Sequence, residues 1–379
     1  MRITRQLWTI FKYLTGALKA GIPSQVYWII NDECNLRCKF CNFWKGIYHK
    51  EGKKILNTQE IKNLILQMSN LKVPYLLFTG GEPFLREDML EILEYAVNWI
   101  PHIRVQTNGT LITDSIATKI IKKRLLDEIW LSVDGMEYFH DQLRGVGGVF
   151  SKVIDTLDRV TFYKRKYRTL IPYIIVHTVV KESNLGDLSR ILSLCNKYRV
   201  EEWYLSCVTD ISDQRIEATK VALDCPDFYS LQMKTGVDVV TRKNKLPLSL
   251  LEQISQARKK GMTIFIDPLL KSGASLRPRR KCIILWASIM ISPYGEVLVC
   301  PSLDKLIMGD LLKKDLMQVW NNSKFKKIRN LVSSKLLPVC EDCCVQRRTL
   351  LAQLKDPANF KRVFVPRKFR EIFYKYNLF

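Results

Sequence analysis

The sequence predicts an α/β protein. It consists of a partial parallel barrel of six βα units, a (βα)6 barrel, and a small C-terminal domain that bound metal stabilises. Two observations carry this prediction. Short apolar runs alternate with amphipathic helical patterns over residues 25–208, which is typical of a parallel sheet covered by helices. Eight of the eleven cysteines fall into two groups, one near each end of the chain. Six strands suit an open or partial barrel better than a closed eight-stranded one.

The predicted strands are short, nearly continuous apolar runs bounded by turn residues. They are Gln25–Ile30, Tyr75–Thr79, Ile103–Thr107, Glu128–Val133, Tyr173–Val179 and Trp203–Val208. Helices are expected between them, near residues 58–70, 86–100, 113–124, 149–166 and 185–198. In parallel α/β folds ligands bind at the carboxyl ends of the strands. We therefore expect functional residues in the loops that follow the strands.

The remaining chain divides by its composition. Residues 209–281 are expected to bridge the domains and face the substrate, with helical patterns at 226–243 and 248–260 and a short strand at Thr263–Asp267. Residues 282–350 form the cysteine-bearing domain, with a hairpin turning at Pro293-Tyr294-Gly295 and a helix near 315–332. The strands of this hairpin are Ile289–Ser292 and Glu296–Val299. Residues 1–24 and 351–379 are basic and amphipathic.

Composition limits the class of protein and its compartment. With 379 residues and 47% hydrophobic content the chain can bury a full core. The net charge of +23 favours anionic partners. No apolar run reaches the length of about 18 residues that spans a membrane, and residues 1–24 lack the pattern of a secretion signal. We expect a cytoplasmic protein, whose cysteines are metal ligands or buried thiols. Cys195, Cys207 and Cys225 are expected to be small buried hydrophobes.

Three cysteines stand close together directly after the first strand, at Cys34, Cys38 and Cys41. Three thiolates can hold three irons of a cubane and leave the fourth iron open. Structural zinc normally takes four ligands, and His49 is the only nearby residue that could complete such a set. Zinc stays open as an alternative, and an iron–sulfur cluster is favoured.

The spacing of these cysteines, with aromatic Phe40 before the last of them, resembles the radical S-adenosylmethionine (SAM) superfamily. Gly80-Gly81-Glu82-Pro83, after the second strand, is similar to the GGEP turn of that family. The resemblance implies a [4Fe-4S] cluster on the three cysteines, whose open iron chelates the amino and carboxylate groups of SAM. It also implies that the turn backbone and Glu82 bind the SAM amino group, because a carboxylate pairs with an ammonium.

More of the family's pattern follows the third and fourth strands. Asn108-Gly109 and Ser132-Val133-Asp134-Gly135 stand at these strand ends, and Arg144-Gly145 comes shortly afterwards. By the same resemblance, Asn108 and Asp134 belong to the SAM site, and Ser132 and Arg144 contact the ribose or the carboxylate of SAM. The implied chemistry is reductive cleavage of SAM to a 5′-deoxyadenosyl radical, which abstracts hydrogen from a C–H bond. No catalytic residue beyond these ligands is assigned.

The second cysteine group resembles the SPASM and twitch domains that follow many radical SAM barrels. Its members are Cys282, Cys300, Cys340, Cys343 and Cys344, and Gly295-x4-Cys300 is similar to the signature of those domains. No cysteine lies beyond Cys344, which favours the shorter twitch form with one auxiliary [4Fe-4S] cluster. Cys343 is favoured over Cys344 as a ligand, because two intervening residues are the common chelating spacing. A zinc ribbon is the alternative.

The two ends of the chain lie outside the family pattern. Residues 1–20 place six apolar side chains on one helical face and basic residues on the other, and residues 367–379 repeat this character. Such basic amphipathic sequences indicate either an anionic membrane surface or helices packed on the barrel.

Three functions compete. The first is a radical SAM oxidoreductase or transferase that acts on a lipid-linked, phosphorylated or sugar-like small molecule and takes electrons from ferredoxin or flavodoxin. The second is a peptide-modifying SPASM maturase, ranked lower because the 24 residues before the first strand are too few for a leader-binding domain. The third is a zinc-structured nucleic-acid binder, which leaves the GGEP turn unexplained. We expect no nucleic-acid partner, since the basic charge lacks interleaved aromatics.

Overall fold

A computed structural model describes residues 21–46, 48–207, 211–225, 246–267, 270, 282, 284–300, 303, 305–340 and 343. The basic sequences at 1–20 and 351–379, the helical pattern at 226–243 and Cys344 lie outside the described residues. The expected division of the chain into five segments stays a prediction.

Seven parallel strands form the central sheet, and they confirm the predicted α/β barrel unit. The seven strands are β1 (Gln25–Asn31), β2 (Tyr75–Gly80), β3 (His102–Thr107), β4 (Glu128–Ser132), β5 (Tyr173–Val180), β6 (Glu202–Cys207) and β7 (Thr263–Ile266). All eight residues of β5 are buried, because a parallel strand inside an α/β fold is covered on both faces.

The C-terminal strands extend the same sheet. β8 (Ser288–Ile291) pairs in parallel with β1, and β9 (Glu296–Leu298) and β10 (Ile307–Asp310) continue it antiparallel. The order is β10-β9-β8-β1-β2-β3-β4-β5-β6-β7. β7 and β10 stand at opposite ends of this order, so the sheet is an open barrel. The hairpin predicted around Pro293-Tyr294-Gly295 is confirmed.

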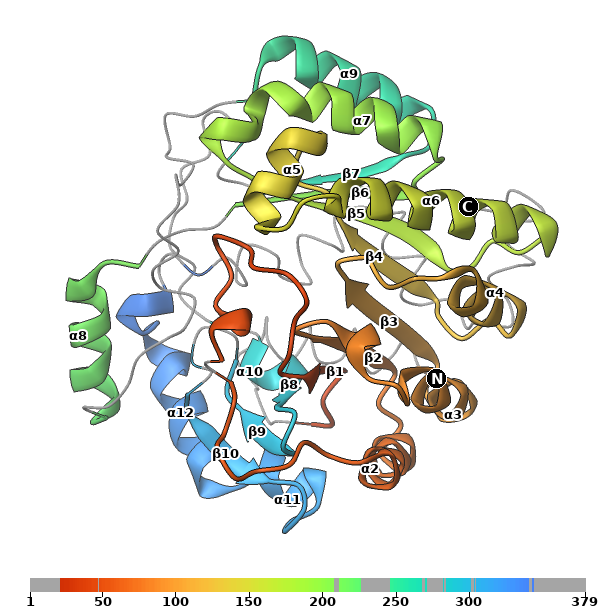
Figure 1. Ribbon diagram of the computed structural model, residues 1–379. Helices are drawn as coiled ribbons and strands as arrows, with labels where there is room; N and C mark the ends of the chain where they lie inside the picture. The colour runs from red at the N-terminus through yellow and green to blue at the C-terminus, as the bar shows by residue number, and fades with distance from the viewer. Residues whose placement is uncertain are drawn as a thin grey trace.

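Helices line the outer face of the curved sheet (Figure 1). Five of them match the predicted stretches: α2 (Thr58–Asn70), α3 (Met89–Trp99), α4 (Asp114–Lys122), α6 (Val149–Lys166) and α7 (Leu188–Lys197). α9 (Leu248–Lys259) matches the later helical pattern, whereas α5 (Glu137–Arg144) and α8 (Asp213–Leu223) were not expected. The helix expected near 315–332 is two helices, α11 (Leu316–Trp320) and α12 (Ser323–Ser334), which follow the short α10 (Ile284–Ala287). The break comes at Asn322, whose side chain accepts a bond from Phe325 N and caps α12.

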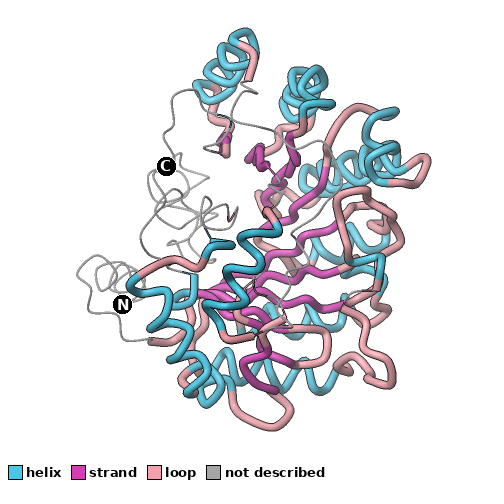
Figure 2. Tube along the Cα trace, turned by 90° about the vertical axis from the view of Figure 1, so that its left-hand side faces the viewer, coloured by secondary structure: helices cyan, strands magenta, loops and turns pink. Residues whose placement is uncertain are grey.

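The main hydrophobic core lies between the sheet and these helices, and includes Trp28, Phe78 and Trp203. Two smaller apolar clusters occupy the other face, one around Trp130, Ile175 and Tyr204 and one around Ile29, Met290 and Leu298. Figure 2 shows the strands as one continuous wall in the interior of the molecule. Within the described part of the chain, every helix is too short or too polar to cross a bilayer.

Candidate active site

The three N-terminal cysteines lie on the loop between β1 and α2. Cys38 is buried and Cys34 and Cys41 are half-buried. The loop is folded by its own backbone, since Cys41 N donates to Cys38 O at 3.1 Å and Trp44 Nε1 donates to the same oxygen at 2.9 Å. In Figure 1 this loop, drawn in red, runs between α5 and the β8–β9 hairpin.

The carboxyl end of α5 holds one side of this loop. Arg37 N donates to Arg144 O and Lys39 N donates to Leu143 O, both at 3.0 Å. Gly145 ends the helix at φ 71°, and a Cβ there would lie 2.4 Å from Arg37 O. Arg144 therefore binds the loop through its backbone carbonyl. Position 145 requires glycine, because its φ is positive and its backbone lies close to that of the loop.

The GGEP turn holds the other side of the loop. Gly81 N donates to Asn31 O at 3.0 Å and Glu82 N donates to Glu33 O at 2.8 Å. A Cβ on Gly81 would lie 1.8 Å from Glu33 O, so no side chain fits between the turn and the residue before Cys34. Pro83 then begins the short 3-10 helix η2 (Pro83–Leu85).

Glu82 is fully buried at the carboxyl ends of β2 and β3. Its carboxylate accepts bonds from Thr107 Oγ1 at 2.7 Å, Asn108 N at 2.8 Å and Phe84 N at 3.1 Å. Burial raises the pKa of Glu82 to about 7, although these three donors act against the rise. A carboxylate offers about four acceptor positions, so one remains for a further donor such as an ammonium.

Asn108 and Ser132 end neighbouring strands beside this carboxylate. Asn108 Nδ2 donates to Asn35 Oδ1 at 2.8 Å, which connects the end of β3 to the cluster loop. Ser132 is half-buried and stands opposite His177 in the β4–β5 register. Asn108 therefore contacts the cluster loop, and Ser132 ends the next strand of the sheet.

Arg144 is buried between Asp134 and the cysteine loop. Its guanidinium pairs with the Asp134 carboxylate, donates to Cys38 Sγ at 3.7 Å and lies 5.4 Å from the Phe40 ring. Burial acts to lower the pKa of Arg144, but Asp134 and Cys38 outweigh it and the pKa rises. Nε of Arg144 has no hydrogen-bond partner among the described residues. The side chain keeps its charge and directs it at the cysteine loop.

The thiols fit a cluster that binds them as thiolates. Burial, together with the charges of Cys38, Glu82 and Cys41, raises the pKa of Cys34 to about 11. Thiolates that repel one another in this way need a cation to bring them together, and iron supplies it. No three His, Cys, Asp or Glu side chains of the described residues surround a single-ion site. A cubane needs a wider set, because each thiolate binds a different iron.

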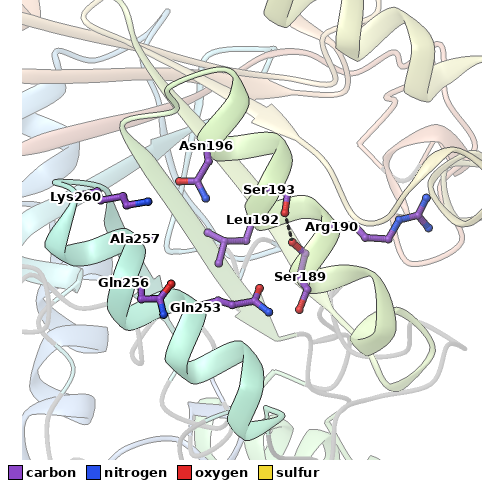
Figure 3. Close-up of a pocket in the computed structure, with 9 residues that line it drawn as sticks. All are labelled: Ser189, Arg190, Leu192, Ser193, Asn196, Gln253, Gln256, Ala257 and Lys260. Carbon is purple, nitrogen blue, oxygen red and sulfur yellow. Dashed lines mark hydrogen bonds between the residues drawn. The ribbon is translucent and has the colours of Figure 1, made fainter.

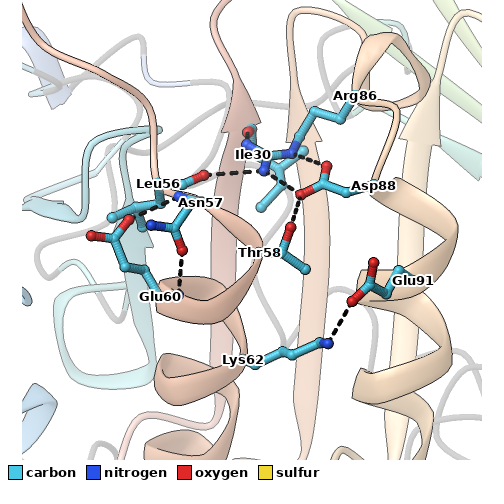
Figure 4. Close-up of polar contacts among 9 residues, drawn as sticks. All are labelled: Ile30, Leu56, Asn57, Thr58, Glu60, Lys62, Arg86, Asp88 and Glu91. Carbon is cyan, nitrogen blue, oxygen red and sulfur yellow. Dashed lines mark hydrogen bonds and ion pairs between the residues drawn. The ribbon is translucent and has the colours of Figure 1, made fainter.

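Arg86 was not predicted, although it follows the GGEP turn by three residues and ends the short helix η2. Its guanidinium donates to Ile30 O at 3.2 Å and Leu56 O at 3.0 Å and pairs with Asp88 at 2.8 Å (Figure 4). Asp88 also accepts a bond from Thr58 Oγ1 at 2.6 Å. These contacts fix both ends of the cluster loop against the turn, since Ile30 precedes the loop and Leu56 follows it.

The C-terminal hairpin reaches the cluster loop, a contact the sequence did not reveal. Tyr294 Oη donates to Asp32 Oδ2 at 2.7 Å and accepts from Lys50 N at 2.9 Å. Lys50 Nζ in turn pairs with Glu296 at 2.5 Å. Asp32 follows β1 directly, so the strand-end rule was enough to single it out, but its partner is 262 residues away.

Lys181 is a second residue that the strand-end rule was enough to find. It follows β5, is buried, and its ammonium lies 5.0 Å from the Phe40 ring centroid. Phe40 therefore has two cations near its ring, Lys181 and Arg144. Both charges stand beside the cysteine loop, where they favour an anionic cluster and the carboxylate of SAM.

The second cysteine group is only partly described. Cys282, Cys340 and Cys343 are buried and Cys300 is half-buried. Cys343 N donates to Cys340 O at 3.3 Å, so these two cysteines share one turn after the short 3-10 helix η5 (Pro338–Cys340). Of the three isolated cysteines, Cys195 and Cys207 are buried, and Cys225 is half-buried.

The inner face of the sheet forms an aromatic wall next to Ser132. Tyr204 stacks on Phe265 with centroids 4.3 Å apart, and Trp130 lies 5.1 Å from Tyr204. His177 Nε2 and Ser206 Oγ are hydrogen-bonded at 2.7 Å, and Ser206 lies two residues nearer the carboxyl end of β6 than Tyr204. Trp130 and Tyr204 are buried, and Phe265, which packs against this cluster, is half-buried.

A separate pocket of about 370 Å³ opens between α7 and α9 (Figure 3). Ser189, Asn196, Gln253 and Lys260 are among its lining residues. It lies on the outer helical layer and contains none of the predicted site residues, so we do not assign it to the active site.

Comparison with known proteins agrees with this geometry. The radical SAM superfamily matches residues 28–195, and an iron–sulfur cluster-binding (SPASM) domain matches residues 282–344. The AdoMet-dependent heme synthase of Methanosarcina barkeri is 24% identical over 81% of this chain and 85% of its own length. The mycofactocin maturase MftC of Mycolicibacterium smegmatis is 25% identical over 84% and 75%.

Solved structures share the fold. SuiB of Streptococcus suis bound to S-adenosylmethionine superposes with a TM-score of 0.61 and 14% identity, covering 94% of this chain and 80% of its own. Native anSMEcpe with bound AdoMet gives 0.55 and 17%, covering 94% and 99%. The relatives are enzymes, which removes the zinc-structured nucleic-acid binder from the candidates. The chain belongs to the radical SAM superfamily, with a C-terminal SPASM domain, and is an enzyme that uses SAM, a [4Fe-4S] cluster and auxiliary iron–sulfur.

Proposed function

We propose that this enzyme abstracts hydrogen from a small phosphorylated, sugar-like or lipid-linked substrate held against the aromatic wall of its barrel. Cys34, Cys38 and Cys41 would hold a cluster that, once reduced, would supply the electron for cleavage of SAM, and the 5′-deoxyadenosyl group released would take the hydrogen atom. The observation that carries the proposal is the meeting of the cysteine loop, the GGEP turn and Arg144 at the strand ends.

Different residues of this chain bind different parts of SAM and its cluster. Cys34, Cys38 and Cys41 hold the cluster, and the backbone of Gly80, Gly81 and Pro83 with the Glu82 carboxylate positions the SAM ammonium. Asn108 and Asp134 fix the strand ends around it, while Ser132 and Arg144 contact the ribose and the carboxylate. Phe40 packs between the two cations and excludes water from the loop.

The aromatic wall supports a ring-shaped substrate. Sugar rings and other cyclic molecules pack their apolar faces on aromatic side chains, and the half-buried Phe265 is the member of this cluster that such a ring would meet. Ser206, two residues beyond Tyr204 along β6, and its partner His177 are proposed to bond substrate hydroxyls. This arrangement orients a C–H bond toward the strand ends, where the radical forms.

Two other substrates have specific support. A peptide is favoured by the likeness to SuiB, one of whose structures is bound to the precursor peptide SuiA. A carboxylate-bearing tetrapyrrole is favoured by the likeness to AdoMet-dependent heme synthases, and the net charge of +23 suits such an anion. Metabolite and lipid profiling of a deletion strain separates these classes, since only the true substrate accumulates.

We propose ferredoxin or flavodoxin as the one-electron donor, since radical SAM enzymes need a reductant of this kind. The basic amphipathic sequences at 1–20 and 367–379 support a cytoplasmic enzyme that is peripheral on the inner face of a membrane. The auxiliary iron–sulfur is proposed to be one [4Fe-4S] cluster on Cys282, Cys300, Cys340 and Cys343, with Cys344 as the alternative last ligand.

Iron counting tests the cluster assignment. After anaerobic reconstitution we expect about eight irons and eight sulfides per chain, from two cubanes. Changing Cys34, Cys38 and Cys41 to Ala removes about half of the iron and all formation of 5′-deoxyadenosine. The matched control changes Cys195, Cys207 and Cys225 to Ala and keeps the full iron content. Full retention of iron in the first variant contradicts the assignment.

A further inference from the structure

Basic side chains gather at the end of the barrel opposite the active site. Six turns lead from a helix into the next strand there: residues 67–74, 96–101, 119–127, 162–172, 194–201 and 257–262. We call them together the helix-end surface. They hold fourteen Lys and Arg residues and two Asp and Glu residues. All of these cations are exposed except Lys164, which is half-buried and pairs with Glu201 at 2.6 Å.

Four of these turns place a cation where glycine is the usual residue. Lys72, Arg124, Arg168 and Arg199 have φ between 49° and 57°. After each, the next residue's N–H bonds a carbonyl of the preceding helix, as Leu125 N does to Ile120 O at 2.8 Å. This is the Schellman helix ending, whose left-handed residue is usually glycine. A side chain there costs on the order of 1 kcal/mol, so the repeated choice of Lys or Arg needs a reason.

The helix dipole accounts for only part of this charge. A cation in the last turn interacts favourably with the negative end of a helix, and the effect falls off within that turn. The end of α4 has four cations, at Lys119, Lys122, Lys123 and Arg124, and the end of α6 also has four. Neighbouring cations repel one another, so such groups suit an anionic partner.

Apolar side chains are exposed among these cations. Trp99 is 44% exposed, Phe162 53% and Leu170 41%. Lys166 lies 5.9 Å from the ring centroids of both Phe162 and Tyr163. Exposed tryptophan, phenylalanine and leucine with surrounding lysines form the mixture that enters the boundary between lipid headgroups and acyl chains.

We propose that the helix-end surface docks on an anionic phospholipid membrane. The occupant is a membrane because the surface is wide, carries isolated apolar side chains and spans six turns, which gives many weak headgroup contacts and shallow insertion. This inference rests on the membrane association proposed above and gives it a surface on the folded body. Gly21, the first described residue, leads into β1 at this same end of the sheet.

The proposal fixes an orientation. The cysteine loop and the GGEP turn stand at the carboxyl ends of the strands, one strand length of about 20 Å from the helix-end surface. A docked molecule therefore turns its SAM site away from the lipid. Among the proposed substrates this favours a water-soluble one over a lipid in the same leaflet.

The test uses the full chain, reconstituted with iron, and vesicles of phosphatidylcholine with or without phosphatidylglycerol. Arg165→Glu with Lys166→Glu reverses two exposed charges on the helix-end surface. The control, Lys313→Glu with Lys314→Glu, reverses two exposed charges after β10, near the hairpin that contacts the cluster loop. Both pairs change the net charge equally. Phe162→Ser with Leu170→Ser tests insertion, and a chain without residues 1–20 tests the terminal sequence separately.

We expect the Arg165/Lys166 pair to weaken binding to phosphatidylglycerol vesicles at least tenfold and the control pair to change it less than twofold. The Phe162/Leu170 pair weakens the part of binding that survives high salt. We expect all variants still to form 5′-deoxyadenosine. Formation of this product reports on the radical chemistry, and vesicle binding reports on docking, so a failure of one is distinguished from a failure of the other. Equal losses in both charge pairs, or wild-type binding to RNA in preference to vesicles, overturns the proposal. So does loss of binding on removal of residues 1–20 when the Arg165/Lys166 pair has no effect.

Discussion

At the scale of single residues, Glu82 connects the fold to SAM binding. Its three donors hold the carboxylate in place and leave one acceptor position. Glu82→Gln keeps the volume but loses the charge, so we expect the dissociation constant of SAM to rise about ten- to a hundredfold, from a charge-assisted bond of about 1.5–3 kcal/mol. Equilibrium binding to reconstituted protein measures this, with iron content unchanged. Glu60→Gln, at an exposed helix cap, is the control. An unchanged dissociation constant contradicts the role of Glu82.

Glu128 shows a buried charge that serves stability. Its carboxylate accepts bonds from Arg104 at 2.7 Å and His102 at 2.9 Å, and from Tyr75 and Trp130 at 3.2 Å. Burial acts to raise the pKa of Glu128, but Arg104 and His102 outweigh it and hold the pKa well below its usual range. Glu128→Gln leaves Arg104 buried without its counter-ion, which costs about 3–5 kcal/mol of unfolding free energy at pH 7.

The pH dependence of this effect has a definite sign. A carboxyl whose folded pKa is depressed contributes stability above its unfolded pKa and loses it as the pH falls toward the folded value. The difference between wild type and Glu128→Gln therefore shrinks below about pH 4.5. Urea unfolding at pH 7 and pH 4 measures it. Glu91→Gln, whose partner Lys62 leaves it 60% exposed, is the control and costs below about 1 kcal/mol. A difference that is constant with pH would contradict this account.

At the scale of elements, the GGEP turn and the cluster loop have no space between them. Gly81→Ala places a methyl group 1.8 Å from Glu33 O, so the loop or the turn must move. We expect this variant to lose about half of its iron, the share held by Cys34, Cys38 and Cys41, and to keep the auxiliary share. Gly147→Ala is the control, because a Cβ there meets no atom within 4 Å. Iron analysis with electron paramagnetic resonance distinguishes the two clusters, and full iron in Gly81→Ala would refute the expected clash.

The sequence predicted those elements whose own pattern of apolar residues specifies them. Strands such as β5 are apolar along their whole length, and α4 carries a clear apolar stripe. α5 was missed because its buried face includes the polar residues His140 and Arg144, so the helix lacks a simple apolar stripe. Both residues bond Asp134, and Arg144 also contacts the cysteine loop. α8 was missed because it has hardly any buried face, with Thr219 as its buried residue.

At the scale of the whole molecule, the C-terminal hairpin supports the cysteine loop. β8 pairs with β1, and Tyr294 bonds Asp32 beside the cysteine loop. A chain that ends at residue 281 loses both contacts, so we expect it to aggregate or to bind no iron at the N-terminal cysteines. A chain with Cys282 and Cys340 changed to Ala keeps the hairpin, and we expect it to keep about half of its iron. Gel filtration and iron analysis make the comparison. A soluble truncated chain with its N-terminal cluster would contradict it.

The site was predictable from sequence where its residues follow strands directly. Cys34, Glu82 and Asn108 come shortly after predicted strands and Ser132 lies near the end of one, and the parallel fold gathers such positions at one end. The contacts of Arg86 and Tyr294 were not predictable, because their partners are backbone carbonyls or residues more than 200 positions away. The pairing of Arg144 with Asp134 needed α5, which the sequence pattern did not reveal.

The pairing of β1 with β8 has a consequence for how the protein is made. Gln25 to Trp28 pair with Ser288 to Ile291, so one side of β1 has no strand to pair with until the ribosome has added some 260 further residues. At about 5–20 residues per second, this takes roughly 13 to 52 seconds. During that time the sequence Gln25–Asn31, largely apolar, exposes unpaired backbone groups to other nascent chains. We therefore expect the yield of folded protein to depend on the rate of synthesis and on any chaperone that covers this strand.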